Sequence, residues 1–412
     1  MKKFDIIIAG GGMAGATAAL ALSHLQLKIA VIEPIEPALD ISPSFDQRAV
    51  ALSASSVAIF KTLELWDKIK PLACAINDIH ISDQGYFGFT RIHAKDYDVE
   101  ALGQVIPLDQ TGPILWQAIR ERENIELFCP SKISEINPVG LQLKNNEITV
   151  TISHKNNASK LSAKLLLAAD GTFSSVAKMV GIKTQRDSYS QHAVIANIST
   201  ELPHNNQAFE RFTKHGPLAL LPLTRNRMSL VWCQRNEDLK KVMSFKDEKF
   251  KKQLQSEFGF RLGQITKVGE RYEYPLSLHL PEKNYSGRVL LLGNSAHTLH
   301  PIAGQGFNVG LRDIAALCDG ILDARHKNQD IGSEQFLETY TSQRQADWQQ
   351  TITATDSLVR IFTSEFLPLV LARNKALCLL DKMPFVKQKL ARAAMGYSGK
   401  SARLTCGIPI NL

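Results

Sequence analysis

The chain has 412 residues, of which 44% are hydrophobic and 21% charged, so it can bury a sizeable core and does not need disulfides to fold. Its net charge of +8 forms no dense basic block and no ribbon of basic and aromatic residues, which argues against nucleic-acid binding and leaves either a solvated surface or attraction to an anionic membrane face or an acidic partner. Six scattered cysteines without a CxxC pair, no signal-peptide pattern and no apolar run of about 20 residues predict a cytoplasmic protein with reduced thiols.

The first elements form a predicted β-α-β unit. Residues 4–10 are a short β-branched run that ends in glycines, residues 13–26 are rich in alanine and leucine, and residues 28–33 are a second apolar run. Short continuous apolar runs are typical of parallel strands buried on both faces, and the stretch between them is typical of a helix. The unit therefore predicts the opening of a doubly wound α/β sheet.

Two later runs predict further buried strands of the same sheet. Residues 164–170 end at Asp170, and residues 288–294 end in a Gly-Asn pair. Ligands of open α/β sheets bind beyond the carboxyl ends of the strands, so both ends are candidate parts of a site. The first domain is therefore expected to be assembled from distant pieces of the chain.

Between these strands the pattern changes to alternating polar and apolar residues. This alternation over residues 181–283 predicts antiparallel strands with one solvated face, and residues 80–94 are consistent with a hairpin of the same sheet. From about residue 330 onward, apolar residues at helical spacing predict helices, for example over residues 356–382. The sequence thus predicts a second, antiparallel-sheet domain and a C-terminal helical region.

The segment 10–15 carries a dinucleotide-binding pattern. Gly10, Gly12 and Gly15 have the G-x-G-x-x-G spacing, and they follow a predicted strand and open a predicted helix. The first glycine permits a tight turn, the second lets main-chain amides approach a pyrophosphate, and the third lets helix and strand pack closely. Glu33, at the end of the next strand, is placed to accept hydrogen bonds from ribose hydroxyls. The pattern does not distinguish NAD from FAD.

Residues 293–308, GNSAHTLHPIAGQGFN, need a separate explanation. His297 and His300 are three residues apart and no Asp, Glu or Cys accompanies them, which argues against a metal site, and the G-K-[ST] ending of a P-loop is absent. What remains is a strand end, a loop of small residues and a Gly-Gln-Gly turn at 304–306 that opens a helix over 307–322. Such a loop brings main-chain N–H groups to a flat ring and stabilises negative charge on it, as a reduced flavin requires.

The three motifs together resemble the fingerprints of the flavin-dependent aromatic hydroxylases, the p-hydroxybenzoate hydroxylase-like group. The resemblance rests on GGGMAG, LLLAADGTFSS and GNSAHTLHPIAGQGFNVGLRD, in this order and spacing. Further stretches are similar to the branch of the family that serves ubiquinone biosynthesis: SFDQRAVALS (44–53), LGQVIPL (102–108), AFERFTKHGPLALLPL (208–223) and DWQQTITATDSLVRIF (347–362). The resemblance covers nearly the whole chain.

This resemblance implies an α/β fold, α+β overall, with a Rossmann-like FAD-binding domain, an antiparallel-sheet substrate domain and C-terminal helices. On this chain the division assigns three segments to the FAD-binding domain (1–75, 105–180 and 284–335), two to the substrate-binding sheet (76–104 and 181–283) and one to the helical region (336–412). FAD is the implied cofactor, with NAD(P)H as electron donor and O2 as co-substrate.

The resemblance also implies roles for single residues. Glu33 would bind the adenosine ribose, and Arg48 would reach the pyrophosphate or ribityl region. Asp170 would lie near the pyrophosphate, in a motif that also serves the nicotinamide donor, and Asn294 would contact the ribityl chain or the pyrophosphate. The complete predicted cofactor-binding set is Gly10, Gly12, Gly15, Glu33, Arg48, Asp170, Gly171, Gly293, Asn294, Gly304, Gly306 and Phe307.

At the ring end, Gly306 and Phe307 would offer amides to the flavin, and Pro301 would line the reaction pocket. Gln305 and His215 are candidates for a hydrogen bond to the substrate phenol, although each is also consistent with a structural role. No metal is expected, and no Ser/His/Asp set is present, because the cofactor carries the hard chemical step.

Two positions depart from the family pattern. The third fingerprint usually contains Gly-Asp, whereas this chain has Gly293-Asn294; Asn keeps an acceptor oxygen but loses the charge, so binding is expected to survive with altered redox tuning. The second fingerprint usually ends in a basic residue, whereas Ala177 stands there and Lys178 follows. This second departure weakens any inference about how a nicotinamide donor docks.

The implied reaction is hydroxylation of an aromatic ring. Reduced FAD and O2 would form a C4a-hydroperoxide, which transfers one oxygen to an electron-rich phenol, here 2-polyprenyl-6-methoxyphenol, to give the hydroquinone. The protein must orient that ring and exclude water. A polyprenyl tail implies peripheral contact with the inner face of the membrane, a lipid-carrying partner or other ubiquinone-biosynthesis proteins.

Three alternatives stay open on the residues alone. A paralogous hydroxylase could act at another ring position, a non-catalytic flavin-binding scaffold could serve the biosynthetic complex, and a flavin reductase or dehydrogenase would not use O2. The intact glycine loops at all three fingerprints argue against the scaffold, because they preserve the ring site as well as the phosphate site.

Overall fold

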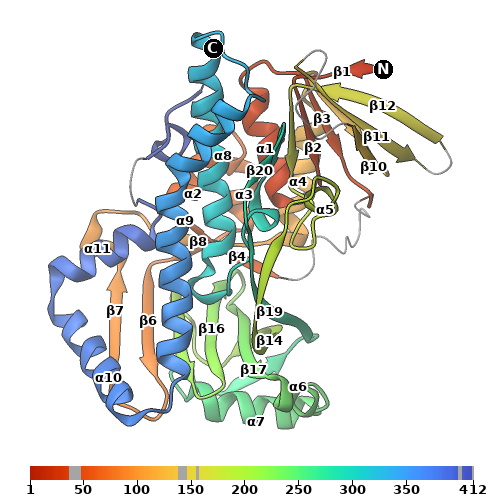
Figure 1. Cartoon of the computed structure of the whole chain (residues 1–412). Helices are drawn as coiled ribbons and strands as arrows, with labels where there is room; N and C mark the ends of the chain where they lie inside the picture. The colour runs from red at the N-terminus through yellow and green to blue at the C-terminus, as the bar shows by residue number, and fades with distance from the viewer. Residues whose placement is uncertain (37–47, 138–145, 155–156, 398–400, 411–412) are drawn as a thin grey trace.

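The computed structural model describes residues 1–36, 48–137, 146–154, 157–397 and 401–410, and within them the chain forms four sheets. Figure 1 shows a sheet with its helices in the upper half, a larger sheet in the lower half, and the long helix α9 running beside both. Residues 44–47 of the stretch SFDQRAVALS lie outside the described residues.

The six-stranded sheet has the order β20-β21-β13-β2-β3-β9, and every neighbouring pair from β21 to β9 is parallel. Its strands are β2 (Ile6–Ala9), β3 (Ile29–Ile32), β9 (Ile125–Phe128), β13 (Leu165–Ala168), β20 (Tyr285–Ser286) and β21 (Val289–Leu291). The residues of β2, β3, β13 and β21 are all buried, which explains why these strands are continuous apolar runs. The predicted β-α-β unit and both distant strands are confirmed.

Helices cover one face of this sheet and a second sheet covers the other. The helices are α1 (Met13–Ser23), α2 (Ala54–Thr62), α4 (Leu108–Arg120) and α8 (Gln305–His326). The second sheet contains β1 (Lys2–Lys3), β10 (Lys132–Asn137), β11 (Ile148–His154) and β12 (Asn157–Ala163), with α5 (Ser175–Met179) beside it. Successive side chains of β2 point to opposite faces, so Ile6 and Ile8 join the first apolar cluster while Ile7 and Ala9 join the second.

The larger sheet has the order β18-β14-β17-β16-β15-β6-β7, with β19 paired to β14. Its strands are β6 (Asp78–Asp83), β7 (Phe89–His93), β14 (Thr184–Thr200), β15 (Gln207–Thr213), β16 (Gly216–Leu223), β17 (Arg227–Arg235), β18 (Ile265–Val268) and β19 (Tyr272–Pro281). The predicted antiparallel sheet and its hairpin over 80–94 are confirmed. The hairpin joins the sheet by a parallel pairing of β6 with β15, which no local pattern indicated.

The two faces of the larger sheet meet different neighbours. α6 (Asn236–Met243) and α7 (Asp247–Phe258) pack on the outer face, where Trp232 meets Phe250 edge to face. On the inner side lies a small sheet of β4 (Ala49–Ser53), β5 (Cys74–Ile76) and β8 (Gly103–Pro107), which connects to α3 (Trp66–Ile69). The inner face is therefore the one turned toward the six-stranded sheet (Figure 1).

The C-terminal region is helical, as predicted: α9 (Glu334–Thr363), α10 (Leu367–Lys382) and α11 (Pro384–Ala394). The apolar pattern over 356–382 does not form one helix, because the chain is extended at Ser364 and Phe366. Pro368 has no N–H for the Ser364 carbonyl and its ring would clash with that carbonyl in a continuous helix, whereas it is tolerated in the first turn of α10, so the break is favoured at this place. The domain boundaries given above stay a prediction.

Candidate functional site

Three sequence motifs meet at one edge of the six-stranded sheet. Because β2, β13 and β21 are parallel neighbours, their carboxyl ends lie side by side. The Gly171 N–H donates to Ser295 Oγ (3.0 Å), and Ser295 Oγ–H donates to Asp170 Oδ1 (3.3 Å). A Cβ added at Gly293 would lie 2.9 Å from the Ala14 side chain. The predicted convergence of the second and third motifs on the glycine turn is therefore observed.

The glycine turn is packed too closely for any side chain at two of its positions. Gly10 has a φ of +101°, and a Cβ there would lie 2.4 Å from the Ala169 carbonyl oxygen. A Cβ at Gly15 would lie 1.9 Å from the Gly10 carbonyl oxygen. At Gly12, the residue before α1, a Cβ would meet nothing within 4 Å. The turn thus holds helix and strand together while leaving open space in front of the helix N-terminus, where a pyrophosphate binds in such folds.

Glu33 faces the same turn from the end of β3. The N–H of Gly11 donates to Glu33 Oε2 (2.6 Å), and the N–H of Ile35 donates to Oε1 (3.0 Å). Burial raises the pKa of Glu33, and the two backbone hydrogen bonds partly offset that rise. Each carboxylate oxygen still has acceptor capacity, so the position is compatible with binding a ribose diol.

Trp116 supports the turn from α4, a contact that the sequence patterns did not reveal. Its indole N–H donates to the Gly11 carbonyl (2.9 Å), and a Cβ at Gly11 would lie 2.9 Å from its ring. A tryptophan on the buried face of an amphipathic helix gives no local sign of this role, because the two residues are 105 positions apart.

Asp170 is anchored to the start of α5. Its Oδ2 accepts from the N–H groups of Ser175 (2.7 Å) and Val176 (3.1 Å) and from the Ser175 hydroxyl (3.0 Å). The carboxylate is thus oriented by a helix N-terminus beside the glycine turn. Ala177 is buried in the apolar cluster behind α5, whereas Lys178 is exposed. The displaced basic charge of this motif therefore points to solvent.

The 293–308 segment contains two short 3-10 turns, Gly293–Ser295 and Ile302–Gly304, before α8 begins. Gly304 has a φ of +60°, a left-handed conformation that glycine adopts without strain, and a Cβ there would lie 3.3 Å from the Ala51 side chain. At Gly306 a Cβ would meet nothing within 4 Å, so its main chain borders open space. Asn294 is exposed at the other end of the segment.

Asn308 fixes this segment against β4, and the sequence patterns missed it. Its Oδ1 accepts from the N–H of Ser53 (2.8 Å) and the hydroxyl of Ser56 (2.7 Å). Its Nδ2 donates to the carbonyls of Ala51 and Gly304, both at 2.8 Å. The amide is fully buried and uses donors and acceptors alike, so it holds the glycine turn before α8 in place.

The two histidines of the segment are buried rather than aimed at a ligand. His297 Nε2 lies 3.4 Å from Asp313 Oδ2, and His300 Nδ1 accepts from the Ile302 N–H (3.2 Å). Burial lowers the pKa of both rings, that of His300 to about 4, so both are neutral near pH 7. Within the described residues no group of three or more His, Cys, Asp or Glu side chains is placed to hold a metal ion.

The remaining candidates occupy two places. Pro301 belongs to the loop, whereas Gln305 and Phe307 lie in the first turn of α8, and the Phe307 side chain packs against the core of the six-stranded sheet, which leaves its main chain as the group that can meet a ring. His215 is placed differently: it lies in the β15–β16 turn, with Nδ1 3.3 Å from Asp238 Oδ2 of α6. Its role as a phenol-binding group gains no support from this contact.

Arg48 precedes β4 and contacts the larger sheet. Its guanidinium is 4.7 Å from the ring centroid of Tyr274 in β19. Its proposed reach toward the cofactor stays a prediction.

These features fit an FAD molecule. The open main chain at Gly12 suits a pyrophosphate, the Glu33 carboxylate suits the ribose, and the open main chain at Gly306 suits the flavin ring. The family model described as "FAD binding domain" matches residues 3–355. The chain belongs to this family.

Characterised relatives extend over nearly the whole chain. The "Ubiquinone hydroxylase UbiL" of Rhodospirillum rubrum is 30% identical over 99% of this chain and 94% of its own length. The "3-demethoxyubiquinol 3-hydroxylase" of Escherichia coli is 28% identical over 95% of this chain and 98% of its own. The resemblance to flavin-dependent hydroxylases of the ubiquinone branch is confirmed, and the protein is an FAD-dependent monooxygenase of the aromatic-hydroxylase type.

The fold also matches solved structures. The p-nitrophenol 4-monooxygenase PnpA of Pseudomonas putida superposes with a TM-score of 0.79 at 18% identity, covering 98% of this chain and 100% of that one.

All six cysteines are free. None of the described helices is both long enough and apolar enough to cross a bilayer.

Proposed function

We propose that the protein hydroxylates the ring of a polyprenylated phenol in ubiquinone biosynthesis, converting 2-polyprenyl-6-methoxyphenol to the hydroquinone, with NAD(P)H as electron donor and O2 as co-substrate. The observation that carries the proposal is the meeting of all three glycine-containing motifs at one sheet edge, with the loop before α8 in contact with the larger sheet through Ile302 and His300. Relatives named for ubiquinone hydroxylation support the substrate class.

Bound FAD would supply the activation of O2 for the reaction. The task of the chain is to bind, orient and enclose. Asn308 holds the glycine turn whose N–H groups face the ring site, so those donors are in place before the reaction begins. The larger sheet, whose inner face is turned toward the six-stranded sheet, would cover the ring site from the other side and exclude water.

An apolar cluster beside the loop before α8 supports a substrate with a long tail. Ile302, in the loop, packs in one cluster with Phe212 of β15, with Val359 and Phe362 of α9 and with Leu377 of α10. The rings of Phe212 and Phe362 are stacked, with centroids 3.6 Å apart. This cluster links the loop before α8 to the C-terminal helices, and the buried ion pair of Arg373 with Asp83 (2.8 Å) borders it beside Phe362.

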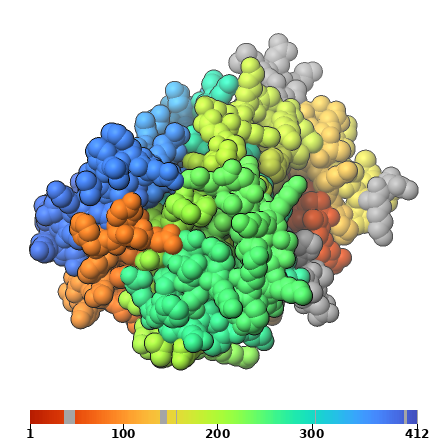
Figure 2. All heavy atoms as spheres, turned by 90° about the horizontal axis from the view of Figure 1, so that it is seen from below, coloured from red at the N-terminus to blue at the C-terminus, as the bar shows by residue number. Residues whose placement is uncertain are grey.

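The outer faces of those helices support contact with a membrane. α10, α11 and the residues just before them expose large apolar side chains: Phe366, Leu367, Leu371, Leu379, Met383, Phe385, Val386 and Leu390. Phe87, at the tip of the β6–β7 hairpin, is 63% exposed and lies beside α10, where its carbonyl oxygen is 4.0 Å from Cys378 Sγ. Seen from below in Figure 2, this apolar surface projects at one edge of the molecule.

The charges on the same surface favour an anionic bilayer over an acidic protein or a neutral face. The exposed basic residues of α10 and α11 are Lys375, Lys382, Lys389 and Arg392, against the single acid Asp381, which accepts from Lys387. Apolar side chains flanked by lysines are typical of helices that lie in the membrane interface. We therefore propose a peripheral location at the inner face of the membrane, where the substrate is dissolved.

Deletion of the gene tests the substrate. The proposal expects accumulation of the 2-polyprenyl-6-methoxyphenol precursor and its disappearance on complementation with the intact gene. A precursor lacking a different hydroxyl would identify a paralogous enzyme with another ring position. Gly15 is required for the close packing of the glycine turn at residues 10–15 and not for surface contacts. Rescue by a Gly15→Val variant that binds no FAD would therefore identify a scaffold. An unchanged quinone pool would contradict the proposal.

A further inference from the structure

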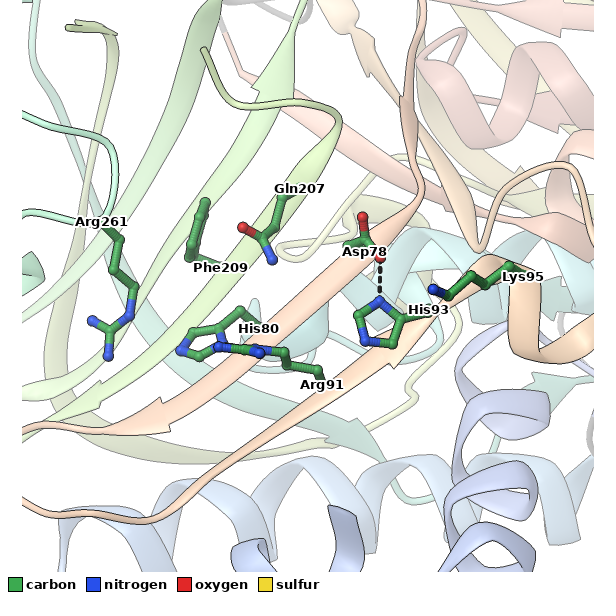
Figure 3. A pocket seen from close by; sticks show the side chains of 8 residues that line it. All are labelled: Asp78, His80, Arg91, His93, Lys95, Gln207, Phe209 and Arg261. Atoms are coloured by element: carbon green, nitrogen blue, oxygen red, sulfur yellow. Dashed lines mark hydrogen bonds and ion pairs between the residues drawn. The ribbon is translucent and has the colours of Figure 1, made fainter. Parts of the chain in front are cut away.

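The outer face of the larger sheet has a cavity of about 540 Å³ that the hydroxylation site does not include. Figure 3 shows its lining side chains projecting from β6, β7 and β15 toward one space, with Arg261 on the far side. The lining residues are Asp78, His80, Arg91, His93, Lys95, Gln207, Phe209 and Arg261. α7 packs over the neighbouring part of this face through Phe258, which meets Phe209, and leaves the part over β6 and β7 uncovered.

The cavity is strongly cationic. Arg91, Lys95 and Arg261 are exposed around it, and none of the three forms an ion pair with any residue that the structure describes. Asp78 is the one acid of the lining, and it is bonded to His93. The pKa of Arg261 is lowered first by burial and then by repulsion from Arg91.

Charges behind the cavity do not change this balance. Arg211 lies on the same face of β15, where its Nε–H donates to the Glu257 carbonyl (2.7 Å), and Glu257 compensates part of its charge. Asp381, on the opposite side of β7, accepts from the Arg91 backbone N–H and from Lys387. No further carboxylate in the described chain lines the cavity.

His80 supplies an unsatisfied donor at the buried side of the cavity. It is 4% exposed, and its Nδ1 accepts from the Arg91 Nε–H (3.4 Å), so the ring proton resides on Nε2. Nε2 is buried and has no hydrogen-bond partner among the described residues. The pKa of His80 is lowered to about 4, first by burial and then by Arg261 and Arg91, so the ring is neutral near pH 7. A buried N–H without a partner carries a desolvation cost that a bound acceptor would remove.

From this geometry we propose that the cavity is a binding site for an organic phosphate. Two guanidinium groups, the His80 Nε2–H and the Gln207 amide surround a space that a phosphate group with its several acceptor oxygens can satisfy. The cavity is much larger than a single phosphate, and Phe209 and the neighbouring Phe89, stacked on His80, provide apolar walls for the organic part.

The site is separate from the hydroxylation chemistry. Its side chains lie on the face of the sheet opposite to the one that packs with β4, β8 and α10, since Ile79, Ile81 and Thr90 point inward while His80 and Arg91 point outward. The ligand would therefore act on the substrate sheet from outside, either as a free metabolite or as a phospholipid headgroup. Both sources carry the same phosphate group, which is attached to a small soluble molecule in one case and to a membrane lipid in the other.

Calorimetric titration of the FAD-loaded protein with inorganic pyrophosphate tests the proposal. Loading with FAD keeps the probe out of the glycine turn. We expect one binding site whose affinity falls at least about tenfold in the double variant Arg91→Gln/Arg261→Gln, because each charge-assisted contact is lost while the fold keeps its backbone pairing. The control Lys267→Gln/Lys283→Gln removes two exposed cations elsewhere and should leave the affinity unchanged.

Two further readouts complete the test. In the intact protein, pyrophosphate should shift the His80 side-chain NMR signal, and this shift should vanish in the double variant. Sedimentation with phosphatidylcholine vesicles, with and without phosphatidylglycerol, distinguishes the sources: a loss in the double variant supports a lipid headgroup, and no change supports a free phosphate. Absence of pyrophosphate binding, or equal binding by the double variant, would overturn the proposal. Because no turnover is measured, failure here leaves the proposed hydroxylation unaffected.

Discussion

The edge of the six-stranded sheet and the outer face of the larger sheet are built in opposite ways. At the edge, glycines and main-chain N–H groups from three contiguous motifs form the cradle, and side chains such as Trp116 and Asn308 only hold it. On the outer face, single side chains from three strands, the 3-10 turn after β7 and the loop after α7 form a cationic cavity. Substitutions that add bulk should therefore be most harmful at the glycine turn. Substitutions that remove charge should be most harmful in the cavity.

The largest expected effect is at the edge. Gly15→Val should abolish FAD binding, because its side chain would overlap the Gly10 carbonyl oxygen, only 1.9 Å from the added Cβ. The absorbance of the purified protein near 450 nm, relative to that at 280 nm, measures bound flavin. The control Gly320→Ala, where a Cβ would make ordinary contacts of 3.5 Å with Phe336 in α9, should keep the flavin. Full yellow colour in Gly15→Val would show that the cradle is not where we place it.

The next effect concerns the charges that join α8 to α9. Arg344 is buried, its Nε–H donates to Asp313 Oδ1 (2.6 Å), and it also pairs with Asp347. Arg344→Met leaves two buried carboxylates with less compensation, so we expect a loss of about 3–5 kcal/mol in the free energy of unfolding. Arg360→Met, which removes an exposed pair with Asp356, should have little effect on stability, because solvent screens exposed pairs. Urea denaturation of both variants measures the contrast, and equal losses would contradict it.

A smaller effect depends on pH. The folded-state pKa of His300 is about 4, below its ordinary value of 6.5, so between these values the unfolded chain binds more protons than the folded one. Its contribution is therefore fully present above pH 6.5 and is lost as the pH falls toward 4, by up to about 3 kcal/mol. The His300→Gln variant should show a flatter decline of unfolding free energy over this range, whereas His326→Gln at the exposed end of α8 should match the intact protein. A decline unchanged in His300→Gln would refute the assignment.

The smallest effect on stability concerns the exposed apolar surface. Leu367→Ser/Phe385→Ser should change the unfolding free energy by less than about 1 kcal/mol, because both side chains are mostly exposed. Binding to vesicles that contain phosphatidylglycerol should nevertheless weaken several-fold, since the apolar anchors are lost. Ile408→Ser changes an exposed apolar residue outside these helices and should leave vesicle binding intact. Unaltered vesicle binding by the double variant would contradict the proposal that α10 and α11 contact the membrane.

Much of the fold could be predicted from local patterns. Continuous apolar runs predicted the buried strands β2, β3, β13 and β21. The glycine spacing predicted the turn before α1. Both patterns follow directly from backbone geometry. The pairing of β6 with β15 could not be predicted, because it joins segments more than 120 residues apart.

The supporting residues of the site were not predictable for the same reason. Asn308 binds Ser53 across 255 positions, and neither residue differs locally from an ordinary polar residue. His215 was a candidate for a phenol-binding or a structural role, and its contact with Asp238 of α6 could not be read from the sequence. His80 and Arg261 carry no motif at all, so the cationic cavity becomes visible only when the sheet and the loop after α7 are in place.

The length of α9 has a mechanical consequence. Its 30 residues span about 45 Å, with Arg344 bonded to α8 about a third of the way along and Phe362 stacked on the larger sheet near the C-terminal end. A helix is stiff along its axis, so α9 can transmit a displacement from one half of the molecule to the other. If α10 binds a bilayer as proposed, its tilt is either taken up by the short link at 364–366 or transmitted along α9 to the turn before α8.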